Sequence, residues 1–282
     1  DYFNRTEPET FVGVALHQFN SSDPMFISPD KYLNINFSGA PEMCFDRSMN
    51  VHPFESNILF SSASNKIPLA DLEVKGVWNE DETAIDITSD ITSFTNDLDL
   101  NVAYVLTADG LSDFTWTQAN YYYGYDANDY SDLPFYDDFK EFCKGGKYAT
   151  KSVSDLTFND VAIASTYVDN KSTVEGFSKA NVGDKMQNKH TLNYDIPSSL
   201  KVVADKKKMN IVAILTTSDG VFVNARKAKV LSHTTGMDNM EVETSRPVAV
   251  YSLDGVQQHT LNKGMNIVKM SDGKVKKVNI SR

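Results

Sequence analysis

The sequence predicts a protein of the α+β class that is mostly β. Residues 67–106 alternate apolar and polar side chains in three stretches joined by short polar turns, the pattern of half-buried antiparallel strands. Residues 244–282 contain three turns of the Asp-Gly or Lys-Gly type between short β-type segments. The 282 residues, 41% hydrophobic and 11% aromatic, can bury a large core in one or two domains with a small third piece.

The N-terminal region opens abruptly. Asp1–Arg5 reads as the end of an element, and Phe11–Leu16 is an unbroken apolar run, typical of a strand buried on both faces in a parallel sheet. A parallel strand needs a neighbour and a crossover of about a dozen residues, and neither precedes this run. We therefore expect the natural protein to have a further N-terminal segment. Ser28-Pro29-Asp30 predicts the start of a short helix.

A tight turn and a helix complete this first region. Gly39-Ala40-Pro41 reads as a turn that enters a short strand, so the Ala40–Pro41 bond is a candidate cis peptide. The segment Phe54–Ala63 predicts one or two helical turns.

Residues 67–232 predict an antiparallel β-sandwich, because successive strands joined by short turns form a meander. Within the second strand, Ile85, Ile87 and Ile91 face one side, and Asp219-Gly220 is a strong hairpin turn later in the chain. The expected strands are Leu69–Val77, Thr83–Phe94, Leu100–Leu106, Leu156–Phe158, Val161–Ala164, His190–Tyr194, Leu200–Val203, Ile211–Leu215 and Val221–Ala225.

The stretch Thr115–Lys147 interrupts the strand pattern. It is polar and aromatic, which predicts irregular structure, with a short helix over Pro134–Cys143 that ends at Gly145-Gly146. After the sandwich, residues 233–243 read as a polar linker. Residues 244–282 then predict a small β module with strands Val248–Leu253, Met265–Met270 and Val275–Ile280.

Composition excludes several classes of function. The net charge of −11 and the pI of about 4.9 oppose binding to phosphate backbones, so we expect no nucleic-acid partner. Apolar runs such as Ile211–Leu215 are too short to span a bilayer. With two cysteines, no CxxC and five scattered histidines, the sequence predicts no metal site, no cofactor and no catalytic residues in this chain.

The two cysteines, a histidine–aspartate pair and an acidic loop each have a structural and a functional interpretation. Cys44 and Cys143 are expected to be small buried hydrophobes; a reactive thiol or a disulfide between them is the alternative. His17 and Asp23 are expected to form a loop-ordering hydrogen bond, and an acid/base pair is the alternative. The acidic loop Asp126–Asp132 is expected not to bind calcium tightly, because its spacing is not that of an EF-hand.

Aromatic residues supply the one candidate interaction surface. Tyrosine and tryptophan combine apolar area with a polar group, which favours contact with a protein or a glycan. Packing at the edge of the sandwich is the alternative. The candidate surface residues are Trp116, Tyr121, Tyr122, Tyr123 and Tyr125.

Three groups of short motifs occur between residues 11 and 230. They are Gly13–His17 with Asp23-Pro24-Met25, Gly39-Ala40-Pro41 and Asp46-Arg47; Gln118-x-Asn120-Tyr121; and Ile211-Val212-Ala213 with Asp219-Gly220 and Val223-Asn224-Ala225. Together they resemble the Bacteroidetes-type family of twenty-eight-kilodalton outer membrane proteins. The resemblance implies a thioredoxin-like part followed by a β-sandwich. Pro41 would match the cis-proline that faces the cysteines of thioredoxin folds, and the CxxC of redox-type members would precede Asp1.

The tail carries a separate resemblance. Val250–Gly255, Lys263–Val268 and Ser271–Val278 look like the small C-terminal sorting module of secreted proteins from the same bacteria. This resemblance implies export, with surface attachment or secretion.

We therefore expect a truncated thioredoxin-like part (1–66), a β-sandwich (67–232), a linker (233–243) and a sorting-type module (244–282). The expected function is that of a non-catalytic cell-envelope or secreted protein that acts through interaction surfaces on an unidentified protein or glycan. Membrane attachment would come only through a missing N-terminal segment or the tail. The alternative is a thiol-disulfide oxidoreductase whose CxxC lies upstream of this chain.

Overall fold

A computed structural model of the chain describes residues 2–28, 35, 37–169, 171–233, 247–258, 264–270 and 275–280. The chain forms two compact units, residues 1–234 and 235–282. Antiparallel strands make up most of both, and the described helices are short and lie in the first unit, so the protein is α+β and mostly β, as predicted. Residues 1–66 and 67–232, which the sequence analysis divides, belong to the same compact unit.

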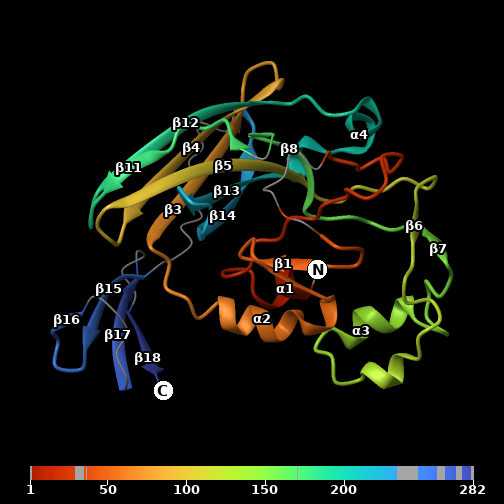
Figure 1. Ribbon diagram of the computed structural model, residues 1–282, viewed down its shortest axis with the longest axis horizontal. Helices are drawn as coiled ribbons and strands as arrows, with labels where there is room; N and C mark the ends of the chain where they lie inside the picture. The colour runs from red at the N-terminus through yellow and green to blue at the C-terminus, as the bar shows by residue number, and fades with distance from the viewer. Residues whose placement is uncertain are drawn as a thin grey trace. The chain divides into compact units, whose positions relative to one another are not determined.

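The first unit contains most of the regular structure (Figure 1). Its helices, with 3-10 helices marked η, are α1 (Tyr2–Thr6), η2 (Pro53–Glu55), α2 (Ser56–Ala63), η3 (Ala127–Tyr130), α3 (Tyr136–Phe139), η4 (Lys140–Phe142), α4 (Ser198–Val203) and η5 (Lys206–Lys208). Its strands are β1 (Met43–Phe45), β2 (Met49–Val51), β3 (Ala70–Trp78), β4 (Ala84–Ser93), β5 (Leu98–Ala108), β6 (Thr117–Ala119), β7 (Ser152–Ser154), β8 (Val161–Ser165), β9 (Tyr167–Val168), β10 (Lys171–Ser172), β11 (Phe177–Ala180), β12 (Lys185–Asn193), β13 (Met209–Thr217) and β14 (Phe222–Leu231).

One eight-stranded sheet dominates this unit. Its strand order is β11-β5-β13-β14-β3-β4-β12, and β8 also pairs with β5. All pairs are antiparallel except β14 with β3, which pair in parallel over only two registers, Val230 with Gly76 and Leu231 with Val77. The sheet therefore curls at this short junction, and β4 and β12 lie across from β5.

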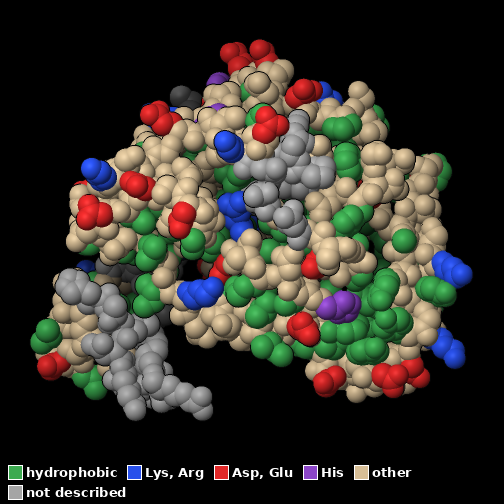
Figure 2. All heavy atoms as spheres, in the orientation of Figure 1, with side chains coloured by type: hydrophobic (Ala, Val, Ile, Leu, Met, Phe, Trp, Pro, Cys, Tyr) green, Lys and Arg blue, Asp and Glu red, His purple; other side chains and the backbone are tan. Residues whose placement is uncertain are grey.

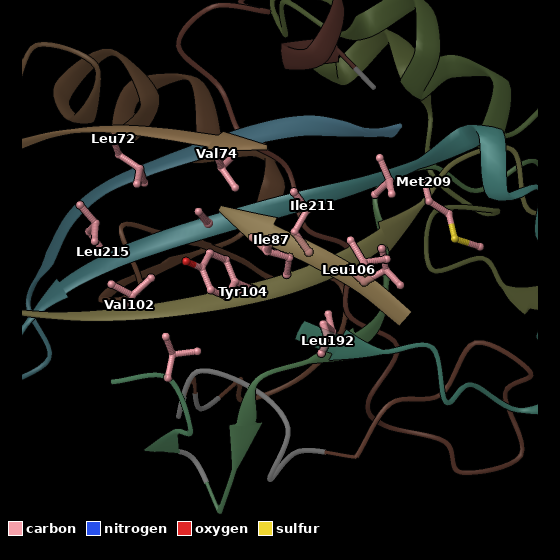
Figure 3. Close-up of a cluster of buried hydrophobic side chains, with 14 of the residues drawn as sticks. Leu72, Val74, Ile87, Val102, Tyr104, Leu106, Leu192, Met209, Ile211 and Leu215 are labelled. Carbon is pink, nitrogen blue, oxygen red and sulfur yellow. The ribbon is translucent and has the colours of Figure 1, made fainter. Parts of the chain in front are cut away.

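The two halves of the curled sheet enclose the main core. Tyr104 of β5 is fully buried, and its hydroxyl lies 2.6 Å from the Ser89 hydroxyl of β4 and 3.1 Å from Oδ1 of Asn188 of β12. Figure 3 shows Tyr104 beside Ile87, Val102 and other apolar side chains of this core. The predicted alternation in β4 is confirmed, because Ile85, Ile87 and Ile91 are at most 1% exposed.

The strands β5 and β13 are buried on both faces. Val102, Tyr104 and Leu106 of β5 face the main core, whereas Ala103 and Val105 belong to a second cluster on the outer face. The N-terminal segment covers that outer face, since three of its partly buried side chains pack against the second cluster: Val12, Val14 and Leu16. This third layer explains why the sequences of β5 and β13 are nearly continuous apolar runs.

The prediction of a doubly buried strand at Phe11–Leu16 is wrong. The segment forms one parallel bridge to the sheet, where the Ala15 amide donates to the Asp160 carbonyl at 2.7 Å and the Ala162 amide donates to the Ala15 carbonyl at 2.9 Å. Its side chains are half-buried except at Gly13. Its apolar character comes from covering a sheet and not from a place inside one.

A second correction concerns Leu200–Val203, which forms the helix α4 and not a strand. The fixed φ of proline suits the start of a helix, and Pro197 directly precedes α4. Within this helix Leu200 is buried and Val202 is 86% exposed. The short predicted strand Leu156–Phe158 is reduced to a single bridge between Phe158 and Leu111. The helix expected to start at Pro29 and Asp30 lies outside the described residues.

The second unit is a four-stranded antiparallel sheet of order β16-β15-β17-β18. Its strands are β15 (Pro247–Ser252), β16 (Gln257–Gln258), β17 (Gly264–Met270) and β18 (Val275–Ile280). The three strands predicted for the tail correspond to β15, β17 and β18. The predicted linker 233–243 falls outside the described residues, apart from His233.

Candidate functional site

The connection between β5 and β8 forms a lobe rich in tyrosine, residues 112–155, which we call the aromatic lobe. It contains the short ladder β6–β7, the 3-10 helices η3 and η4, and α3. In Figure 1 it lies beside α2 and the β1–β2 hairpin of the N-terminal region. Figure 2 shows hydrophobic side chains gathered over this part of the molecule, with a histidine at the margin.

Asn120 organises the aromatic lobe from its interior. Its side-chain amide donates to the carbonyls of Phe142 at 2.7 Å and Tyr148 at 2.9 Å, and its Oδ1 accepts from the Tyr122 amide at 2.9 Å. The residue is only 8% exposed. The segment around Asn120 and Tyr122 is therefore tied to the distant Phe142 and Tyr148 through one side chain, which holds these parts of the irregular loop together.

Phe54 of the N-terminal region joins the lobe through ring contacts. Its ring centroid lies 5.5 Å from that of Tyr122, 4.7 Å from that of Tyr130 and 5.1 Å from that of Phe139. The Tyr122 hydroxyl is buried and has no hydrogen-bond partner among the described residues. Burial, and then the nearby Tyr125, raise the pKa of Tyr122 far above its ordinary value.

A groove of about 250 Å³ lies where the aromatic lobe meets the N-terminal region. The Ala40–Pro41 peptide bond at its wall is cis, the geometry expected at this position from the sequence. Tyr121, 58% exposed, contributes the lobe side. The residues that line the groove are Ser38, Gly39, Ala40, Pro41, Glu42, His52 and Tyr121.

Two ionisable side chains have fixed positions in the groove. The Glu42 carboxylate accepts from the Ser38 amide at 2.7 Å and from the Gly39 amide at 3.4 Å. Nδ1 of His52 accepts from the Phe54 amide at 3.3 Å, so Nε2 carries the proton of the neutral ring. The groove therefore offers an acidic acceptor, an imidazole donor and an aromatic ring.

The predicted interaction residues separate into four environments. Tyr121 lines the groove, and Tyr123 is 40% exposed on the lobe. Tyr122 and Tyr125 pack in the ring cluster, where a hydrogen bond with Tyr121 and burial raise the pKa of Tyr125. Trp116 packs against the main core of the sandwich and does not line the groove.

The predicted pairing of His17 with Asp23 is present, with Nδ1 of His17 3.0 Å from Oδ2 of Asp23. Gln118 Nε2 donates to the same oxygen at 2.8 Å, and the Met25 amide donates to the other at 2.8 Å. Burial opposes ionisation of Asp23, but the bonds from Gln118, His17 and Met25 lower its pKa overall. This cluster ties the loop at Asp23 to β6 and orders the base of the aromatic lobe.

The remaining candidates form no site together. Cys44 and Cys143 are both free thiols, and burial raises the pKa of each. Asp126 caps η3 by accepting from the Asn128 amide at 3.0 Å. Within the part of the chain that the structure describes, no three His, Cys, Asp or Glu side chains are grouped to hold a metal ion.

Sequence reasoning missed Glu42, His52 and the organising role of Asn120. A signal existed for two of them: Glu42 stands directly after the turn proline, and Asn120 belongs to the Gln118-x-Asn120-Tyr121 motif. His52 had no local signal, since its place in the groove depends on the fold of the hairpin β1–β2 before it.

Comparisons with known proteins do not assign a family. No family model and no curated protein match the chain. Among solved structures, red sea bream transglutaminase is similar over 82% of this chain and 34% of that one, at 10% identity and a TM-score of 0.27. The chain thus spans about a third of that protein's length. None of the described helices has both the length and the apolar character needed to cross a bilayer.

Proposed function

We propose that the protein is a non-catalytic, exported protein of the cell envelope that acts through the groove beside Tyr121. One observation carries the proposal. Residues 80 positions apart in the sequence, at the Pro41 turn and at Tyr121, meet in one open groove. The residues behind them, Asn120 and Phe54, hold the groove walls in place. Recognition sites are commonly formed by irregular loops that a rigid β scaffold holds in position.

The proposal of export rests on the tail. Its motifs resemble the sorting module of secreted proteins, and its three predicted strands correspond to β15, β17 and β18 of a separate compact unit. The envelope location rests on the resemblance of residues 11–230 to the outer membrane protein family. The partner belongs to the chemical classes found there, polypeptides and glycans.

Binding to the groove should depend on Tyr121. We expect the intact chain to bind a subset of ligands on peptide and glycan arrays, and Tyr121→Ala to weaken that signal by about tenfold, because truncating a central aromatic residue costs about 1–2 kcal/mol or more. Phe114→Ala is the matched control, since Phe114 is 86% exposed and does not line the groove. The absence of any bound ligand on the arrays, or an equal loss of binding signal with Phe114→Ala, would contradict the proposal.

A second candidate function, thiol-disulfide exchange, is favoured by one observation. Pro41, which the family resemblance matches to the cis-proline of thioredoxin folds, lines the wall of an open groove. Cys44 follows it by three residues and is half-buried. In this candidate the attacking cysteine would come from a CxxC upstream of Asp1.

This chain by itself should not reduce disulfides. The thiolate is the attacking species, and burial raises the pKa of both Cys44 and Cys143, so neither supplies much thiolate at neutral pH. An insulin-reduction assay should match the buffer rate, and Cys44→Ser should change nothing. Turnover by the unmodified chain that disappears in Cys44→Ser would show instead that Cys44 is a working thiol.

A further inference from the structure

Several tyrosine rings of the aromatic lobe are already covered by cations of the lobe itself. An ammonium or guanidinium over an aromatic face is attracted by the ring quadrupole within about 6 Å of its centroid. The pairs are Lys140 over Tyr136 at 5.6 Å, Lys147 over Tyr148 at 4.6 Å and Lys151 over Tyr123 at 5.6 Å.

Tyr121 differs from these tyrosines. Among the described residues no lysine or arginine lies over its ring, which is 58% exposed and lines the groove. Its ring contacts with Tyr122, edge-on at 5.4 Å, and with Tyr125 at 5.9 Å hold it in place. A ring that is held in place and has an open face can bind a cation supplied by another molecule.

The groove also supplies the opposite charge. Glu42 lines it together with Tyr121, and the amides of Ser38 and Gly39 hold its carboxylate. The Ser38 hydroxyl also donates to this carboxylate, at 3.3 Å from Oε2 and 3.4 Å from Oε1. Both amides bond to Oε2, so Oε1 has only the long contact with this hydroxyl and keeps lone-pair capacity for a ligand. The net charge of −11 on the chain favours the approach of cations over long range.

The size of the groove limits what can enter. Pockets for drug-sized ligands are about 300–1,000 Å³, and this groove is about 250 Å³ and open to solvent. One long side chain fits such a space better than an oligosaccharide. Lysine and arginine have the length, the charge and the donor groups that Tyr121 and Glu42 match.

We propose that the groove binds a lysine or arginine side chain of a partner polypeptide, with the cation between the Tyr121 ring and the Glu42 carboxylate. This inference rests on the proposed function and names its ligand class. His52 Nε2 would donate to a backbone carbonyl of the same segment.

The test measures the affinity of the groove for small molecules that carry a lysine or arginine side chain. N-acetyl-lysine methylamide and N-acetyl-arginine methylamide are titrated into the intact chain at low salt and pH 8, and the ring resonances of His52 and Tyr121 are followed by NMR. We expect saturable shifts with Kd in the range of about 1–10 mM. N-acetyl-norleucine methylamide, which lacks the charge, should bind at least about tenfold more weakly.

Matched variants separate charge from shape. Glu42→Gln keeps an oxygen that can accept from the Ser38 amide but removes the charge. It should weaken binding of the lysine probe about tenfold. Glu55→Gln removes the same charge at an exposed site outside the groove and should leave the affinity within about twofold. Methylammonium chloride tests whether a small free cation binds as well as a lysine side chain, and it should bind more weakly than the lysine probe.

Three outcomes would overturn the inference: norleucine binding as well as lysine, Glu42→Gln without effect, or no shift with either cationic probe. None of these would decide the proposed function, because the array experiment with Tyr121→Ala remains its separate test. Array ligands that are neutral glycans, lost in Tyr121→Ala, would keep the function and overturn the ligand class.

Discussion

Replacing Asn120 with aspartate should collapse the aromatic lobe and abolish binding in the groove. The substitution exchanges two amide donors for a carboxylate that faces the carbonyls of Phe142 and Tyr148. The Phe142 carbonyl loses the amide donor and the Tyr148 carbonyl keeps only the Thr150 amide. The unpaired carbonyl costs about 1–3 kcal/mol, and a buried carboxylate without a cation beside it adds to this cost. The expected loss of unfolding free energy is about 3–5 kcal/mol.

Two measurements report this loss. The thermal midpoint should fall by about 6–20 °C, at about 2–4 °C per kcal/mol for a unit of this size. The tyrosine near-UV circular dichroism should weaken, and proteases should cut between Tyr122 and Tyr148. Asn57→Asp, the same change at an exposed position of α2, is the control and should melt like the parent chain. An Asn120→Asp protein with parental melting and protease resistance would show that the lobe does not depend on this side chain.

Replacing Asp160 should loosen the N-terminal layer from the sheet. Asp160 is 6% exposed, and its carboxylate accepts from Lys227 of β14 at 2.7 Å and from the amide of Asn4 of the N-terminal helix. Its backbone carbonyl holds Ala15. Gly13 leaves room for this carboxylate, since a Cβ there would lie 2.9 Å from Oδ2.

The two obvious substitutions at Asp160 separate charge from backbone conformation. Asp160 has a φ of 56°, a left-handed conformation that asparagine tolerates better than alanine. Breaking a fully buried pair costs about 3–5 kcal/mol, and because the Lys227 side chain is 25% exposed we expect about 2–3 kcal/mol for Asp160→Asn. Asp160→Ala should cost about 1 kcal/mol more through strain.

Urea unfolding followed by tryptophan fluorescence measures these losses, because both tryptophans, Trp78 and Trp116, lie in the first unit. Adding Lys227→Met to Asp160→Asn should recover part of the loss, since it removes the unpaired cation. If Asp160→Asn leaves the urea midpoint unchanged, or if Lys227→Met adds a further full loss, the pair does not anchor the N-terminal layer.

Side-chain alternation and turn residues in the sequence were enough to predict several of the strands. The alternation around Ile85 and Ile87 predicted β4, and Asp219-Gly220 predicted the turn between β13 and β14, where Gly220 has a φ of 89°. The turns of the tail predicted β15, β17 and β18 in the same way. Side-chain alternation and turn chemistry are properties of a few consecutive residues, so they can be read before the fold is known.

The partners of those elements came only from the tertiary structure. An apolar run such as Phe11–Leu16 reports that a segment is buried, but not whether it lies within a sheet or covers one. The pairing of Asp160 with Lys227 and the meeting of Pro41 with Tyr121 join residues far apart in the chain. Such contacts depend on how a curled sheet and its long connections pack, and side-chain periodicity along one segment contains no information about that packing.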